Sequence, residues 1–116
     1  MLERVYVRRS LKNVENGFEF RLKNNVDSGT ISGIKALKVD DMEAPPASIT
    51  VKTQAGERCA EEISARSPFY FRYGAEMVIY VGGAQLPAGE HSLALTIMVM
   101  ETGRLEFKFH DEVMAA

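Results

Sequence analysis

Residues that could bind a metal ion occur at two places in this sequence. His91 follows a Pro-Ala-Gly-Glu segment, and His110, Asp111 and Glu112 are consecutive. A first-row metal site needs three or four ligands that converge on one point. The residue two places after His91 is Leu93, so a paired ligand is missing there, and consecutive strand residues point to opposite faces. We therefore expect His91 to be an ordinary residue at the start of a strand, residues 110–112 to be a solvated tail, and this chain to bind no metal or other cofactor.

Acid–base and nucleophilic chemistry have equally weak candidates. Asp40-Asp41 and Glu61-Glu62 are adjacent pairs, whereas general acid–base catalysis needs carboxylates that face each other across a substrate. Cys59 has no histidine near it in sequence, and a single cysteine is more often a small buried apolar residue than a nucleophile. The Gly82-Gly83 pair lacks the Lys-Ser/Thr of a phosphate-binding loop. The sequence therefore predicts no catalytic residue.

Two apolar segments exceed what one core needs, and they are the candidate partner interface. One is the aromatic run of Phe69, Tyr70, Phe71 and Tyr73; the other is the pair Met98 and Met100, on the face of a strand that should be polar. Either Phe69, Phe71 and Tyr73 join the core, or the run is a surface anchor, since Tyr and Phe are enriched in interfaces. Likewise, either a local loop or another protein covers the two methionines.

The totals narrow the class of protein. The chain has 116 residues, 46% of them hydrophobic and 26% charged, and a net charge of −2, which fits one globular domain over residues 1–116 and argues against a nucleic-acid partner. Cys59 is the only cysteine, so no disulfide forms within the chain. No apolar run is long enough for a signal peptide or for the ~20 residues of a membrane span. We therefore expect a cytoplasmic protein without a membrane partner.

The elements that would position these residues are strands. Most apolar stretches alternate with period two, as in residues 18–22, 49–53, 77–81, 91–100 and 105–110. Polar residues with glycines at 24–33 predict a loop, and 57–67 is the one region with helical character. About seven or eight short strands joined by Gly, Pro and Asn turns predict an all-β fold, an antiparallel β-sandwich of the jelly-roll or Ig-like type.

Three segments together resemble the small β subunit of the bacterial C-glycoside deglycosidases. They are residues 10–20 with the turn Glu15-Asn16-Gly17, residues 34–40, and residues 85–93 with Leu86-Pro87-Ala88-Gly89-Glu90-His91. The resemblance implies a β-sandwich subunit, inactive alone, of a lyase that cleaves the carbon–carbon bond between sugar and aglycone in 3-oxo-C-glycosides of the flavonoid type. It implies a TIM-barrel α subunit as partner, which would carry the chemistry and a divalent metal, Mn being expected.

Two other classes remain open. A carbohydrate-binding module would stack sugar on exposed aromatic residues such as Tyr70 and Tyr73, although tryptophan is absent. A purely structural subunit of an unrelated assembly would need no site at all.

Overall fold

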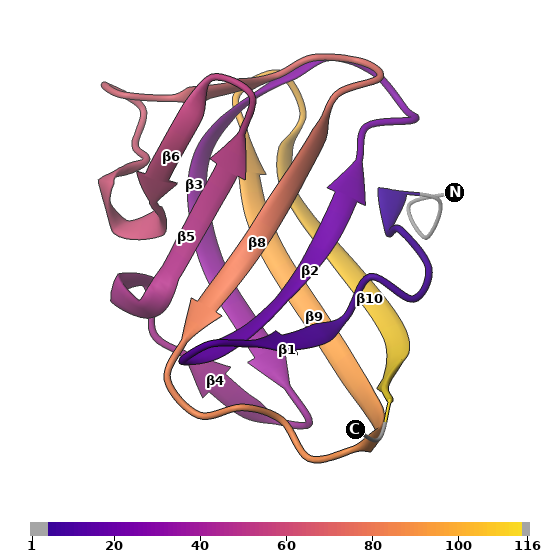
Figure 1. Cartoon of the computed structure of the whole chain (residues 1–116). Helices are drawn as coiled ribbons and strands as arrows, with labels where there is room; N and C mark the ends of the chain where they lie inside the picture. Colours follow the sequence, from indigo (N-terminus) through magenta and orange to yellow (C-terminus); the bar gives the residue numbers. More distant parts are fainter. Residues whose placement is uncertain (1–4, 115–116) are drawn as a thin grey trace.

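Two antiparallel β-sheets packed face to face make up this protein, as the computed structural model shows for residues 5–114 (Figure 1). The predicted all-β sandwich is confirmed. The described residues form ten strands rather than seven or eight, because short strands such as β4 (Met42–Ala44) and β7 (Phe69–Phe71) add to the edges. Between residues 5 and 114 there is no helix with the length and apolar character needed to cross a membrane.

The first sheet has the strand order β1-β2-β8-β5-β6, and the second has β10-β9-β3-β4 with β7 also paired to β3. In the first sheet the strands are β1 (Lys12–Val14), β2 (Gly17–Lys23), β8 (Glu76–Gly82), β5 (Ile49–Thr53) and β6 (Gly56–Cys59). The other strands of the second sheet are β10 (Gly103–Val113), β9 (Gly89–Val99) and β3 (Gly29–Val39).

Alternate residues of both sheets build the core between them. On β9, the inward positions from His91 to Val99 are all buried, as the period-two pattern predicts. Facing them are Phe20 and Ile79 of the first sheet, which are fully buried. Each large apolar side chain removed from water contributes about 1.5 to 3 kcal/mol, so this two-sided core is the main source of stability.

The prediction of a loop over residues 24–33 is wrong from Gly29 onward, where β3 begins. Gly29 and Gly33 lie inside β3, where Gly29 pairs with Phe71 and Gly33 with Met98. Register shifts follow Ile31 and Ile34, so this strand is irregular. Its neighbours on both sides supply hydrogen-bonding partners, and this tertiary pairing outweighs the weak strand propensity of glycine.

The helical character predicted for residues 57–67 is limited to a single 3-10 turn. The segment holds the end of β6 and one 3-10 turn, Ala60–Glu62. The guanidinium of Arg58 donates to the backbone carbonyls of Glu62, Ser67 and Pro68 at 3.3, 2.8 and 2.9 Å. These carbonyls thus have a side-chain partner, and the segment needs no helical ladder to satisfy them.

The two ends of the sandwich differ in what they bring together. At the lower end in Figure 1 are the β3–β4 turn, the β8–β9 connection and the C-terminal end of β10. At the upper end are the β2–β3 loop, residues 24–28, and the β9–β10 turn, residues 100–102. The candidate sites described below lie at these two ends and on the outer face of the second sheet.

Candidate functional site

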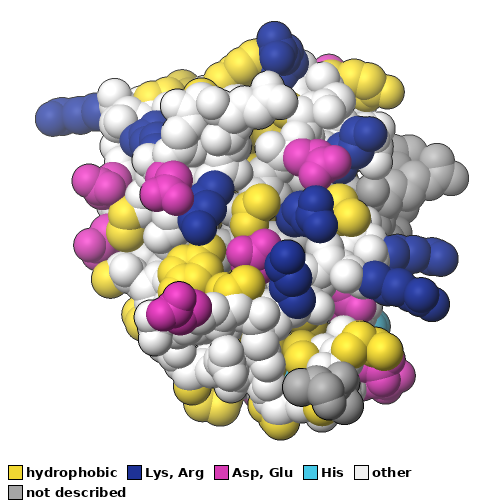
Figure 2. Space-filling model, viewed as in Figure 1, with side chains coloured by type: hydrophobic (Ala, Val, Ile, Leu, Met, Phe, Trp, Pro, Cys, Tyr) yellow, Lys and Arg dark blue, Asp and Glu magenta, His cyan; other side chains and the backbone are white. Residues whose placement is uncertain are grey.

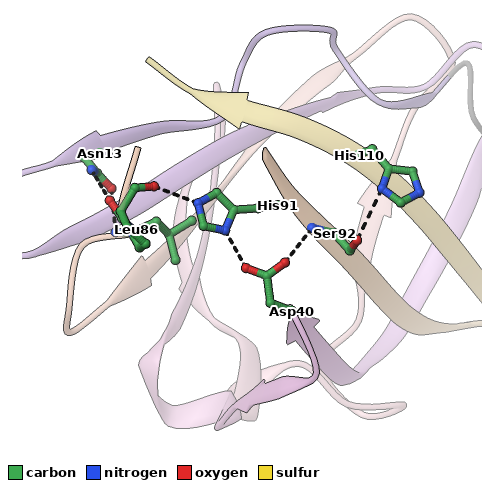
Figure 3. Close-up of polar contacts among 7 residues, drawn as sticks. Asn13, Asp40, Leu86, His91, Ser92 and His110 are labelled. Atoms are coloured by element: carbon green, nitrogen blue, oxygen red, sulfur yellow. Dashed lines mark hydrogen bonds and ion pairs between the residues drawn. The ribbon is translucent and has the colours of Figure 1, made fainter. Parts of the chain in front are cut away.

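His91 lies at the centre of a polar network at the lower end of the sandwich (Figure 3). The side chain is buried, with 6% exposure, and its Nδ1 atom contacts a carboxylate oxygen of Asp40. Its Nε2 atom lies 2.7 Å from the carbonyl oxygen of Pro87. The other oxygen of Asp40 accepts a hydrogen bond from the amide of Ser92 at 2.8 Å. The network joins β9 to the β3–β4 turn and to the β8–β9 connection.

The partners of His91 favour its charged form. A carbonyl and a carboxylate both accept, so both ring nitrogens donate only when the imidazole is protonated. The Pro87 carbonyl and the Asp40 carboxylate accordingly raise the pKa of His91 above its usual 6.5. The Ser92 amide and the imidazolium lower the pKa of Asp40. With both ring nitrogens and both carboxylate oxygens occupied, the pair is arranged as an internal ion pair.

The β8–β9 connection is held in place by a reciprocal pair of hydrogen bonds. The side-chain amide of Asn13 donates to the carbonyl of Leu86, and the amide of Leu86 donates to the Asn13 side-chain oxygen, both at 2.8 Å. Figure 3 shows this clamp beside the histidine. Because Asn13 belongs to β1 and His91 to β9, the network connects the two sheets.

The expectation of a solvated tail at residues 110–112 is wrong for Asp111. Its carboxylate accepts from the hydroxyl of Tyr6 at 2.5 Å and from the amide of Leu11 at 3.1 Å. Tyr6 also stacks on Phe109, with ring centroids 4.6 Å apart. Burial and the Asp111 carboxylate raise the pKa of Tyr6, which keeps its hydroxyl a donor. Asp111 thus holds the N-terminal segment on β10, while His110 is exposed and contacts Ser92 at 3.2 Å.

The remaining chemical candidates are dispersed. Cys59 is partly buried, with its Sγ atom 3.8 Å from the carbonyls of Pro46 and Ala47. Glu61 and Glu62 are exposed on a 3-10 turn. Among residues 5–114, no group of three His, Cys, Asp or Glu side chains is placed to hold a metal ion.

The predicted interface residues divide between the core and the surface. Phe71 is buried and Phe69 partly buried, because they pair with inward positions of β3. Tyr70 and Tyr73 are each 60% exposed, so Tyr73 does not join the core. Met100 is 58% exposed, so no local loop covers it.

Three of these residues share the outer face of the second sheet. Tyr70 pairs with Thr30 of β3, and the amide of Met100 donates to the Thr30 carbonyl at 2.8 Å, so the two side chains flank Thr30. Met98, half-buried, follows on the same face opposite Gly33. We call Tyr70, Met98 and Met100 the outer patch. Cross-strand neighbours on one face lie about 5 Å apart, so Tyr70 and Met100 each neighbour Thr30, which lies between them.

The outer face of the first sheet is of another kind. Figure 2 shows basic and acidic side chains interleaved across it, with smaller hydrophobic areas between them. Cross-strand ion pairs join Lys12 to Glu19 and Lys52 to Glu57, at 4.0 and 3.6 Å. Exposed pairs of this kind contribute little to stability, but they mark a solvated face.

A cavity at the upper end is a site that sequence reasoning missed. It has a volume of about 230 Å³ and lies between the sheets, lined by core residues such as Leu22, Met77 and Ile97. The loop residue Val26, which is 44% exposed, stands at its edge. The only hint of this cavity in the sequence was Val26, an apolar residue within an otherwise polar loop.

The comparisons with known proteins correct the resemblance. The model of the hydroxymethylglutaryl-CoA reductase N-terminal domain family matches residues 1–114. The similarity to a C-glycoside deglycosidase β subunit is therefore wrong, together with the carbon–carbon lyase activity and flavonoid C-glycoside substrates that it implied. The segments that suggested it are a hairpin, the end of β3 with its turn, and the approach to β9. Any antiparallel sandwich contains such elements, so they do not identify a family.

None of the curated proteins matches this chain at a significant level. The family model spans all but the last two residues of the 116. This chain belongs to the family of the hydroxymethylglutaryl-CoA reductase N-terminal domain.

Proposed function

We propose that this chain is a non-catalytic domain of a hydroxymethylglutaryl-CoA reductase, which docks on the catalytic region of that enzyme through the outer patch. The observation that carries the proposal is the match of residues 1–114 to a family described as the N-terminal domain of this reductase. A domain with this description has the rest of the enzyme as its natural protein partner.

The outer patch is the surface best suited to this contact. Tyr70 and Met100 are more than half exposed on either side of Thr30, whereas the outer face of the first sheet carries interleaved charges. Exposed apolar side chains that cluster on one face mark interaction surfaces. Tyrosine is enriched among interface anchors, and methionine adapts to irregular surfaces.

The proposal keeps a larger protein partner and a cytoplasmic location, which the unpaired Cys59 thiol supports. The TIM-barrel fold of that partner and its divalent metal followed only from the resemblance to the deglycosidases, so we do not carry them over. For this chain we propose no catalytic residue and no cofactor.

Co-purification with the hydroxymethylglutaryl-CoA reductase catalytic region of the same organism tests the proposal. We expect the wild-type chain to co-elute with it, and Met98→Glu and Tyr70→Glu to weaken the association at least 30-fold, the effect of losing about 2 kcal/mol at an interface anchor. Met42→Glu is the matched control, because Met42 is 77% exposed but lies in β4 at the other end.

Circular dichroism of each variant separates lost binding from lost folding. A wild-type chain that fails to associate at micromolar concentrations overturns the proposal. Association that Met42→Glu abolishes and Met98→Glu leaves unchanged overturns the assignment to the outer patch.

A further inference from the structure

The cavity at the upper end lies between the two sheets, in the apolar layer of the sandwich. Leu22 and Met77 of the first sheet form one wall, and Ile31, Ile97, Val99 and Phe107 of the second sheet form the other. All six side chains are at most 8% exposed, so the walls belong to the core. The interior therefore offers an incoming group apolar contacts from both sheets.

The size of the cavity limits what enters it. Its volume of about 230 Å³ exceeds the roughly 150 Å³ of an apolar cavity that stays dry and binds benzene. Since the smaller cavity accommodates the six carbon atoms of benzene, this one has room for a somewhat larger apolar group. An apolar chain or a single substituted ring fits this description.

The buried side chain of Asn24 orders the loop at the entrance of the cavity. Its amide nitrogen donates to the carbonyls of Asp27 and Phe71 at 2.7 and 2.9 Å, and its oxygen accepts from the amides of Val26 and Asp27 at 3.2 Å. These bonds fix the β2–β3 loop against β7. A ligand therefore meets a largely preformed entrance, which is the usual state of small-molecule sites.

The negative charge at the entrance of the cavity determines which head group a ligand can carry there. Asp27 and Glu101 both border the cavity, and no Lys, Arg or His side chain is among its described lining residues. Glu101 is held in place because its two oxygens accept from the amide and the hydroxyl of Thr30, both at 2.8 Å. Two carboxylates repel an anionic head group and attract a cationic one.

We propose that this cavity binds a small amphiphile whose apolar tail fills the space between the sheets and whose head group is positively charged. The cavity lies between the sheets whereas the outer patch lies on the outer face of the second sheet, and binding in the cavity does not require the proposed docking.

Titration of the full chain with straight-chain alkylammonium ions tests whether the apolar tail of the ligand enters the cavity. Calorimetry should show Kd falling about fourfold for each added methylene, the equivalent of about 0.8 kcal/mol, until the cavity is full. Alkanols of the same length should bind more weakly than the ammonium ions, and alkyl carboxylates about tenfold more weakly than the alkanols.

Two sets of variants test the location. Leu105→Trp fills the side of the cavity and should weaken octylammonium binding at least tenfold, whereas Leu86→Trp, a half-buried leucine at the lower end, should leave binding unchanged. The double variant Asp27→Asn/Glu101→Gln should bring ammonium and alkanol affinities together without weakening the alkanol. Glu112→Gln, at the far end of β10, is its control.

Four outcomes overturn the inference. They are no binding of octylammonium at millimolar concentration, equal binding of the carboxylate, affinity that ignores chain length, and binding that Leu105→Trp does not change in a folded variant.

Discussion

His91 and Asp40 form an ion pair, although they are 51 residues apart in the chain. The histidine is buried on β9, and the carboxylate, 47% exposed, lies at the β3–β4 turn, where Asp40 has a φ of 51°. The pair joins the start of β9 to the tight turn that follows the neighbouring strand β3. It is therefore a structural contact whose strength depends on pH.

The free energy of unfolding should fall as the pH rises above about 6.5. The folded-state pKa of His91 is raised, so its contribution is fully present below its unfolded value of 6.5 and is lost as the pH passes through the folded-state value. The pKa of Asp40 is lowered, so its contribution is present above 3.8 and is lost in stronger acid. We expect a loss of about 1 kcal/mol between pH 6 and pH 9, since solvent screens the half-exposed carboxylate.

Urea unfolding at several pH values measures this effect. In Asp40→Asn, the free energy of unfolding should no longer fall above pH 6. The variant should keep the fold, because asparagine tolerates the left-handed turn conformation. His110→Gln, which changes an exposed histidine, should leave the curve unchanged. An Asp40→Asn curve identical to the wild type would show that the ion pair contributes nothing.

Asp111 should matter more for stability than its place near the chain end suggests. Asp111→Ala removes the acceptor for Tyr6 and Leu11, and we expect it to cost about 2 to 4 kcal/mol, because bonds to a charged group are the stronger kind. Tyr6→Phe keeps the stacking on Phe109 and should cost about 1 to 2 kcal/mol. Hydrogen exchange should show faster exchange at residues 5–11 in Asp111→Ala. Unchanged exchange there would mean that other contacts hold this segment.

Gly17 should tolerate no side chain. An added Cβ would lie 2.1 Å from the carbonyl oxygen of Val81, on the backbone of the paired strand β8. We expect Gly17→Ala to cost at least about 3 kcal/mol, because the backbone must move. At Gly33 the nearest atom to an added Cβ is the end of the flexible Lys35 side chain, at 3.2 Å, so Gly33→Ala should stay within about 1 kcal/mol of the wild type. Thermal unfolding compares the two, and equal melting temperatures would refute the steric argument.

The fold followed from the sequence because period-two alternation reports local burial. The inward face of β9 and the hairpin at Asn16-Gly17 were predictable in this way. The first half of β3 was not, because Gly29 and Gly33 become strand residues only through their neighbours. Local pattern carries no information about such long-range pairing.

The partners of the polar residues were harder to predict than the strands. Tyr6 and Asp111 meet across 105 residues, and the cavity is lined by residues of both sheets that are far apart in the sequence. One signal was available: His91 is a polar residue on an otherwise apolar inward face, and a buried polar group needs a partner. That rule predicts a partner but not its identity.

Methyl NMR of the methionines in a labelled chain is the most direct test of docking through the outer patch, because two of the three patch residues are methionines. On addition of the reductase catalytic region, we expect shifted or broadened signals for Met98 and Met100. The signals of Met42 and Met114, which are 77% and 78% exposed, should stay unchanged, because Met42 lies in β4 and Met114 follows the C-terminal end of β10. Perturbation confined to Met42 and Met114, or no perturbation of any methionine at saturation, would contradict docking through the outer patch.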